Sequence, residues 1–137
     1  MSVRMKQYCE NALKVANHLK NHEKIDSIRY PALEGDEYYE RAKKYLPLGT
    51  SGVMSINIKG GRQAAMKFMD SVKLACNEVH VADIRTCVLH PASETHRQLT
   101  DEQLVAAGVA PALVRLSVGL ENVDDIIADL DQALAQI

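Results

Sequence analysis

Helical and strand-like apolar spacings alternate along the whole chain, with short connections between them. Apolar side chains recur at helical spacing over residues 3–22 and again over 64–74. Apolar and polar residues alternate over 51–58, as in a half-buried strand, and four of the six residues over 113–118 are apolar, which predicts the last strand. Several connections are too short for parallel crossovers. The pattern predicts an α+β fold in which a small mixed, mainly antiparallel sheet carries helices on one face.

Weaker segments complete the order of elements. They are a strand candidate at 25–30, a charged surface helix at 36–45, and two short strand candidates at 79–81 and 86–89. Thr100 to Gln103 reads Thr-Asp-Glu-Gln, a capping box in which the Thr and Gln side chains satisfy free backbone groups at a helix start. The helix that begins there is brief, because Gly108 and Pro111 follow it.

A last capped helix is expected after residue 122. Asn122 is a favourable N-cap, and Asp124 and Asp125 stand in the first turn, where the helix dipole favours negative charge. The core-facing residues would be Val123, Ile126, Ile127, Leu130 and Leu134. The first helix has no comparable cap beyond Ser2, so we expect it to be the remainder of a longer helix.

The composition is that of one ordinary globular domain, with 137 residues, 47% apolar and 25% charged. The net charge of −2 and the low aromatic content argue against nucleic acid and an anionic membrane as partners. No apolar run reaches the roughly 18 residues of a membrane span and no signal-peptide pattern is present, so we expect a cytoplasmic protein. Cys9, Cys76 and Cys87 are odd in number and lack a CxxC spacing, so we expect reduced packing residues.

Three groupings could carry chemistry, and for each a plainer interpretation is favoured. His18 and His22 have a spacing that can bind a transition metal, but no third ligand is evident, so a solvated surface pair is preferred. Gly60-Gly61 could cradle a phosphate but lacks any phosphate-binding fingerprint, so a strand-to-helix turn is preferred. Cys87 could be a nucleophile with a histidine base, but the sequence places no base beside it. We expect no metal site in this chain.

Arg115 lies inside an otherwise apolar strand pattern, Leu-Val-Arg-Leu-Ser-Val at 113–118. A buried guanidinium needs an anionic partner, and its fork of donors matches a carboxylate at two points. From the spacing alone, an internal ion pair with one of the many Asp and Glu residues is the more frequent outcome, and a ligand site is the alternative.

Two motifs stand in a fixed order, His90-Pro-Ala-Ser-Glu-Thr-His96 and then Arg115-Leu-Ser-Val-Gly-Leu-Glu121. Supporting stretches are residues 5–19, Gly60-Gly61 and residues 99–108. Together they resemble the C-terminal domain of the Cys/Met-metabolism enzymes that depend on pyridoxal phosphate (PLP), nearest to the O-acetylhomoserine sulfhydrylase (O-acetylhomoserine aminocarboxypropyltransferase) branch. The resemblance covers essentially the whole chain but only the C-terminal part of such an enzyme.

The resemblance implies a fold-type I enzyme whose small C-terminal domain helps to close the active site of a larger domain. It places the family's substrate-carboxylate arginine at Arg115, and a Ser or Thr that lines the site at Thr86. Many relatives read Gly-Asp-Ala-Lys-Ser where this chain has Ala-Asp-Ile-Arg-Thr at 82–86, which leaves the role of Arg85 open. The two histidines of the first motif are expected to order its loop.

The parts that hold PLP in such enzymes are not expected in this chain. None of its nine lysines stands in the family's cofactor setting, a Ser/Thr-rich stretch ending in Lys after a strand. The implied enzyme replaces the acetate of O-acetylhomoserine with sulfide or a thiol, is a homo-oligomer and needs the missing PLP domain. We therefore expect one small domain, residues 1–137, that holds no cofactor or catalytic residue and is inactive alone. The alternatives are a methionine γ-lyase, a cystathionine γ-synthase, or a free-standing amino-acid-binding or interaction module without chemistry.

Overall fold

One five-stranded sheet organises the chain. The computed structural model describes all residues, 1–137. In chain order its elements are α1 (Ser2–Leu19), β1 (Ile25–Arg29), α2 (Tyr39–Tyr45), β2 (Val53–Ile58), α3 (Gly61–Ser71), β3 (Cys76–Asn77), β4 (Cys87–Leu89), α4 (Asp101–Ala106), β5 (Leu113–Ser117) and α5 (Val123–Leu134). Helices and strands alternate except between β3 and β4, which follow each other directly.

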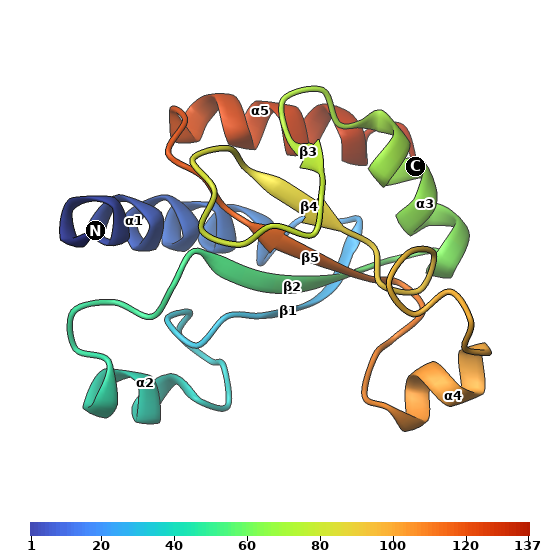
Figure 1. Ribbon diagram of the computed structural model, residues 1–137, viewed down its shortest axis with the longest axis horizontal. Coiled ribbons are helices and arrows are strands. Elements are labelled where there is room, and N and C mark those ends of the chain that lie inside the picture. The colour runs from blue at the N-terminus through green and yellow to red at the C-terminus, as the bar shows by residue number, and fades with distance from the viewer.

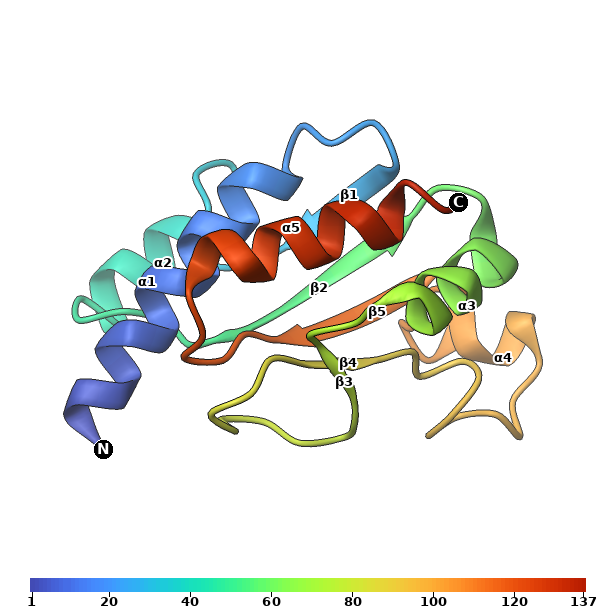
Figure 2. The ribbon, with the colours of Figure 1, turned by 90° about the horizontal axis from the view of Figure 1, so that it is seen from above.

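The strands lie in the order β1-β2-β5-β4-β3. The first three neighbouring pairs are antiparallel, and β3 alone runs parallel to its neighbour β4. Helix α1 packs on β1 and β2, α3 packs on β2 and β5, and α5 contacts both helices, so these three form one layer over the sheet (Figures 1 and 2). Helices α2 and α4 lie apart from this layer, near opposite ends of the strands (Figure 1). The predicted α+β class, with a mainly antiparallel sheet, is confirmed.

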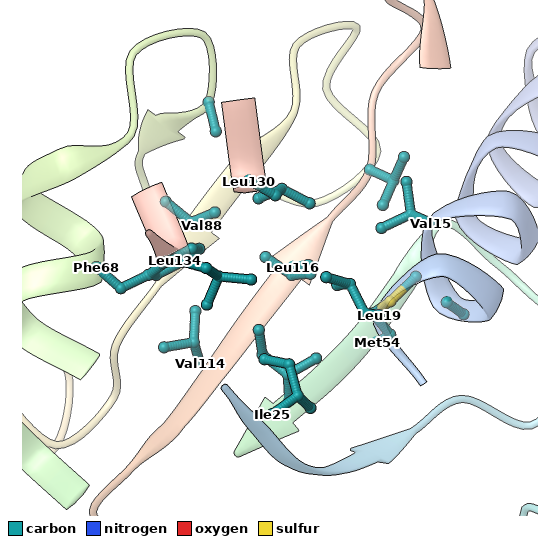
Figure 3. Close-up of a cluster of buried hydrophobic side chains, with 14 of the residues drawn as sticks. Val15, Leu19, Ile25, Met54, Phe68, Val88, Val114, Leu116, Leu130 and Leu134 are labelled. Carbon is teal, nitrogen blue, oxygen red and sulfur yellow. The ribbon is translucent and has the colours of Figure 1, made fainter. Parts of the chain in front are cut away.

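The core lies between this helical layer and the sheet (Figure 3). Alternate residues of β2 are buried in it, namely Met54, Ile56 and Ile58, and the same holds for Val114 and Leu116 of β5. The helices contribute Val15, Leu19, Phe68, Leu130 and Leu134, among others. Because side chains alternate across a strand, the residues between the buried ones point to the opposite, open face of the sheet.

A buried carboxylate fixes the segment that leads from α3 into β3. Asp129 of α5 accepts hydrogen bonds from the backbone N–H groups of Lys73, Leu74 and Ala75 at 2.8, 3.0 and 2.9 Å. These donors have no partner in a regular element, so the carboxylate satisfies what would otherwise be free polar groups close to the core. The contact therefore sets where β3, and the loop after it, begin.

Two predicted helix starts are confirmed at the level of single hydrogen bonds. The Oγ1 of Thr100 accepts from the N–H of Gln103, and the Gln103 side chain accepts from the N–H of Thr100, which completes the capping box of α4. The side chain of Asn122 accepts from the N–H of Asp124 at the start of α5. None of the five helices combines the length and the apolar composition that a membrane-spanning helix needs.

Four predicted elements differ in the structure. The helix predicted at 64–74 runs from Gly61 to Ser71. The strand predicted at 79–81 is wrong: these residues form a loop, because the carbonyl groups of Val79 and His80 accept hydrogen bonds from the side chain of Arg115 rather than from a strand. The helix predicted at 36–45 starts only at Tyr39, because the Asp36 carboxylate binds backbone N–H groups and forms a turn there. The first helix ends at Leu19 rather than at 22.

Candidate functional site

Arg115 is the central residue of β5 and lies on the open face of the sheet. In the strand register Ser55 of β2 and Leu89 of β4 stand beside it. Its neighbours along the chain, Val114 and Leu116, are fully buried in the core on the other face. The alternation therefore directs the Arg115 side chain, which is half-buried, away from the helical layer.

The loop between β3 and β4, residues 78–85, lies against Arg115 and is termed the cover loop. Figure 2 shows it on the far side of β4 and β5 from α5. Nη2 of Arg115 donates to the carbonyl oxygens of Val79 at 2.7 Å and His80 at 3.3 Å. No Asp or Glu forms an ion pair with Arg115, and its buried Nε has no hydrogen-bond partner. The internal ion pair that the spacing alone favoured is absent.

Thr86 is buried where the cover loop joins β4. Its N–H and hydroxyl donate to the two carboxylate oxygens of Glu121 at 2.6 and 2.9 Å, and its Oγ1 accepts from the N–H of Gly119 at 3.0 Å. Thr86 precedes the core residue Val88 by two positions, so its side chain lies on the helical side of the sheet. The structure does not bring Thr86 and Arg115 together. The hydroxyl of Thr86 instead fastens the loop to the segment after β5.

His90 is fully buried and orders the loop that follows β4. Its Nε2 lies 2.8 Å from the carbonyl oxygen of Pro111, an acceptor only, so this nitrogen carries the proton. Its Nδ1 then accepts from the hydroxyl of Ser93 at 2.8 Å. Nδ1 of His96 lies 2.9 Å from the hydroxyl of Thr95, a local contact in the same loop. The predicted ordering role of His90 is confirmed.

Arg85 forms ion pairs within the cover loop. Its Nη2 lies 2.9 Å from Oε2 of Glu78 and 3.2 Å from Oδ2 of Asp83. The hydrogen bonds from Arg85 hold the pKa of the Asp83 carboxyl well below its usual range, and Asp83 in turn raises the pKa of Arg85. Nδ1 of His80 lies 2.7 Å from the same Glu78 oxygen. Sequence reasoning missed His80, because it stands between two valines in a segment that resembles a strand.

Cys87 does not have the environment of a nucleophile. Its side chain is buried, burial raises the pKa of its thiol, and its Sγ lies 3.6 Å from the carbonyl oxygen of Arg85. Glu78, Asp83 and Cys87 offer ligand atoms within 4.8 Å of one another, but Arg85 already binds both carboxylates. All three cysteines are free thiols, as predicted.

The remaining candidate groupings serve the fold. His18 and His22 both approach Asp131 of α5, with Nε2 to Oδ1 distances of 2.8 and 4.0 Å, and so link the end of α1 to α5. Gly60 has a left-handed conformation, with φ of 101°, where β2 turns into α3. The strand-to-helix turn predicted for this glycine pair is confirmed.

The lysines lie at the surface. Eight of the nine are exposed and Lys24 is half-buried. A lysine that forms a Schiff base works in a desolvated setting that lowers the pKa of its amine. The lysines of this chain therefore do not fit the position that binds PLP.

Comparison with known proteins gives consistent matches over the chain. The family model described as Cys/Met metabolism PLP-dependent enzyme matches residues 1–135. The O-acetyl-L-homoserine sulfhydrylase of Leptospira meyeri is 46% identical over 138 residues, which cover 100% of this chain and 31% of that protein. The L-methionine gamma-lyase of Fusobacterium nucleatum subsp. polymorphum is 44% identical over 135 residues, which cover 98% of this chain and 34% of that protein.

A solved structure agrees with the fold. A Campylobacter jejuni protein described as an O-acetylhomoserine (thiol)-lyase, solved with an N'-pyridoxyl-lysine-5'-monophosphate, is similar with a TM-score of 0.89 and 40% sequence identity. The match covers 97% of this chain and 32% of that one. The chain thus spans about one third of the length of the proteins it matches.

Proposed function

Because this chain belongs to the Cys/Met-metabolism PLP-dependent enzymes, we propose that it is the C-terminal domain of an enzyme acting on O-acetylhomoserine, in which Arg115 binds the carboxylate of the substrate. One observation carries the proposal: a half-buried guanidinium in the middle of the sheet has no acidic partner in the chain. The family depends on PLP, but the lysines of this chain do not fit that cofactor, so the rest of the enzyme would hold it.

The hydrogen bonds of Arg115 leave donors for a ligand. Nη2 donates to two neutral carbonyl groups, whereas Nη1 and Nε form no hydrogen bond. Carbonyl oxygens orient a guanidinium but do not neutralise it, and a charge withdrawn from water without a counter-ion is unfavourable. A substrate carboxylate would supply the missing charge and accept hydrogen bonds from Nη1, whose donors are free.

In this role Arg115 orients the substrate and takes no part in bond making. A clamp on the carboxylate fixes one end of the amino acid, and thereby the direction of its Cα–H and of the acetate that leaves. Such a contact exists in both the ground state and the transition state, so its loss would appear mainly in KM. We assign Thr86 a supporting role, because its hydroxyl is already bonded to Glu121 and Gly119.

For the whole enzyme we propose replacement of the acetate of O-acetylhomoserine by sulfide or a thiol. Support comes from relatives named O-acetyl-L-homoserine sulfhydrylase, at 46% and 42% identity. Proteins named L-methionine gamma-lyase match almost as well, at 44% and 43%, so cleavage of methionine is the second candidate. From the family resemblance we also propose a cytoplasmic homo-oligomer.

The partner of the open face would be the PLP-binding part of the enzyme. The cover loop exposes Val79, Val81 and Ile84 by 56%, 55% and 58% beside Arg115. Apolar side chains gathered at one exposed place are typical of a protein interface. This placement would bring the Arg115 side chain to the boundary between the two parts.

Two hybrid enzymes test the proposed reaction. One joins this chain to the unmatched part of the Leptospira meyeri sulfhydrylase, and the other joins it to the unmatched part of the Fusobacterium gamma-lyase. We expect the first hybrid to form homocysteine from O-acetylhomoserine and sulfide, and the second to release methanethiol from methionine poorly. The reverse result would support the second candidate. Hybrids that fold and bind PLP but act on neither substrate would support a module without chemistry.

A further inference from the structure

The direction of the Arg115 guanidinium is set by backbone atoms of the cover loop. The carbonyl oxygens of Val79 and His80 are its only hydrogen-bond acceptors in the structure. A displacement of these two carbonyl groups would therefore release Nη2, because no other group holds it. The contacts that hold the conformation of the cover loop therefore also determine the direction of the Arg115 side chain.

The cover loop is bent at Ala82, the one residue other than glycine with a positive φ, at 56°. A Cβ atom disfavours this left-handed conformation, so the bend needs fixed partners. Both backbone groups of Ala82 have them. Its carbonyl oxygen accepts from the hydroxyl of Tyr8 at 3.0 Å and from Nη2 of Arg4 at 2.9 Å, and its N–H donates to Oγ of Ser117 at 3.3 Å.

Tyr8 connects this bend to α1. Its side chain is 1% exposed, and its hydroxyl accepts from Nη2 of Arg4 at 2.6 Å while donating to Ala82. The Arg4 guanidinium also lies over the ring, 5.6 Å from its centre. Met5 and Tyr8 line a small apolar cavity together with Val81 and Ala82. Without the hydroxyl, the Ala82 carbonyl would keep only the exposed Arg4 as a donor.

We propose that Tyr8 is a positioning residue for the substrate carboxylate and acts through the cover loop. Its hydroxyl holds the bend at Ala82, the bend presents the carbonyl groups of Val79 and His80, and these aim Arg115. The last step rests on the proposed function of Arg115. The first steps concern only hydrogen bonds within this chain, so they can be tested separately.

Chemical modification of arginine tests the first steps in the 137-residue chain. Phenylglyoxal would be the probe, with the rate at Arg115 followed by peptide mass spectrometry. We expect Tyr8→Phe, which removes one hydrogen bond to the loop, to raise the rate at Arg115 about fivefold. Tyr30→Phe is the matched control, because Tyr30 is also fully buried and its hydroxyl donates to the carbonyl oxygen of Ser51 at 2.8 Å. It should leave the rate unchanged.

A second substitution separates the bend from a general loss of stability. Glycine adopts the left-handed conformation without a steric penalty, so Tyr8→Phe combined with Ala82→Gly should bring the rate at Arg115 back to within about twofold of wild type. An unchanged rate in Tyr8→Phe, an equal rise in Tyr30→Phe, or no recovery in the double variant would overturn the proposal.

Kinetics of the sulfhydrylase hybrid test the last step. Tyr8→Phe should raise KM for O-acetylhomoserine about fivefold with kcat within about twofold, while Tyr30→Phe changes neither. If Tyr8→Phe frees Arg115 to the probe but neither it nor Arg115→Lys alters KM, Tyr8 positions Arg115 as inferred and the proposed function of Arg115 is wrong. If Arg115→Lys alone alters KM, the positioning role of Tyr8 is wrong.

Discussion

Two charged side chains, Asp129 and Arg115, differ in how fully the fold supplies their hydrogen-bond partners. Asp129 is buried and receives three backbone N–H groups, so its hydrogen-bonding needs are met by the fold. Arg115 is half-buried and receives two carbonyl oxygens, which use only one of its three nitrogens. The first arrangement is complete without a ligand. The second has donors and a charge to spare, as a ligand-binding side chain requires.

Because Asp129 satisfies three backbone N–H groups, we expect its removal to lower the stability of the fold strongly. Asp129→Ala should lower the free energy of unfolding by about 2–4 kcal/mol, because it leaves three N–H groups near the core without an acceptor. Urea denaturation would measure it. Asp125→Ala is the control, since Asp125 is exposed in the first turn of the same helix and should matter little. Equal losses for the two variants would contradict the role given to Asp129.

The role of a single residue could be predicted where its chemistry does not fit its neighbours in the sequence. An arginine among apolar strand residues is visible in the sequence, and its need for an anionic partner follows from its charge. The bonds of Thr86 to Glu121 and of His80 to Arg115 join segments about 35 residues apart. Contacts between such distant segments leave no periodic pattern in the sequence, so the environments of Thr86 and His80 could not be predicted.

Among the helices and strands, the predictions from periodicity and capping were right where interactions between neighbouring residues determine the structure. The alternation of β2 and the caps of α4 and α5 depend on neighbouring residues, and both appear as expected. The strand predicted at 79–81 was wrong because Val79 and Val81 alternate with His80 as in a strand, whereas the Val79 carbonyl binds the Arg115 side chain and both valines are exposed. Strand β3, with two residues, is too short to leave a pattern, and it is placed by the contacts of Asp129.

In the whole molecule, the layer of helices α1, α3 and α5 covers only one face of the sheet. The helical layer and core lie on one side, and the cover loop with its three exposed apolar residues lies on the other. Residues that pack against a second part of an enzyme would leave such a surface when that part is absent. The one-sided arrangement therefore agrees with a chain that spans about one third of its relatives.

This surface predicts self-association of the chain when it is studied alone. Light scattering should show mass rising with concentration, because burial of the exposed apolar side chains is favourable. Val79→Ser with Ile84→Ser should reduce the association. Val105→Ser should not, since Val105 is 63% exposed but lies on α4, away from the cover loop. A wild-type chain that stays monomeric at high concentration would count against the proposed interface.

If Arg115 is held ready for a substrate carboxylate, its replacement by lysine in the sulfhydrylase hybrid should change the kinetics of that enzyme. Lysine keeps the charge but lacks the planar guanidinium donors that the cover loop orients, so kcat/KM should fall by about 30- to 1,000-fold, chiefly through KM, while Tm changes little. Arg29→Lys is the matched control, because Arg29 lies on the same face but is paired with Glu37 at 2.9 Å. Unchanged kinetics with a large fall in Tm would identify Arg115 as a structural residue that does not bind the substrate carboxylate.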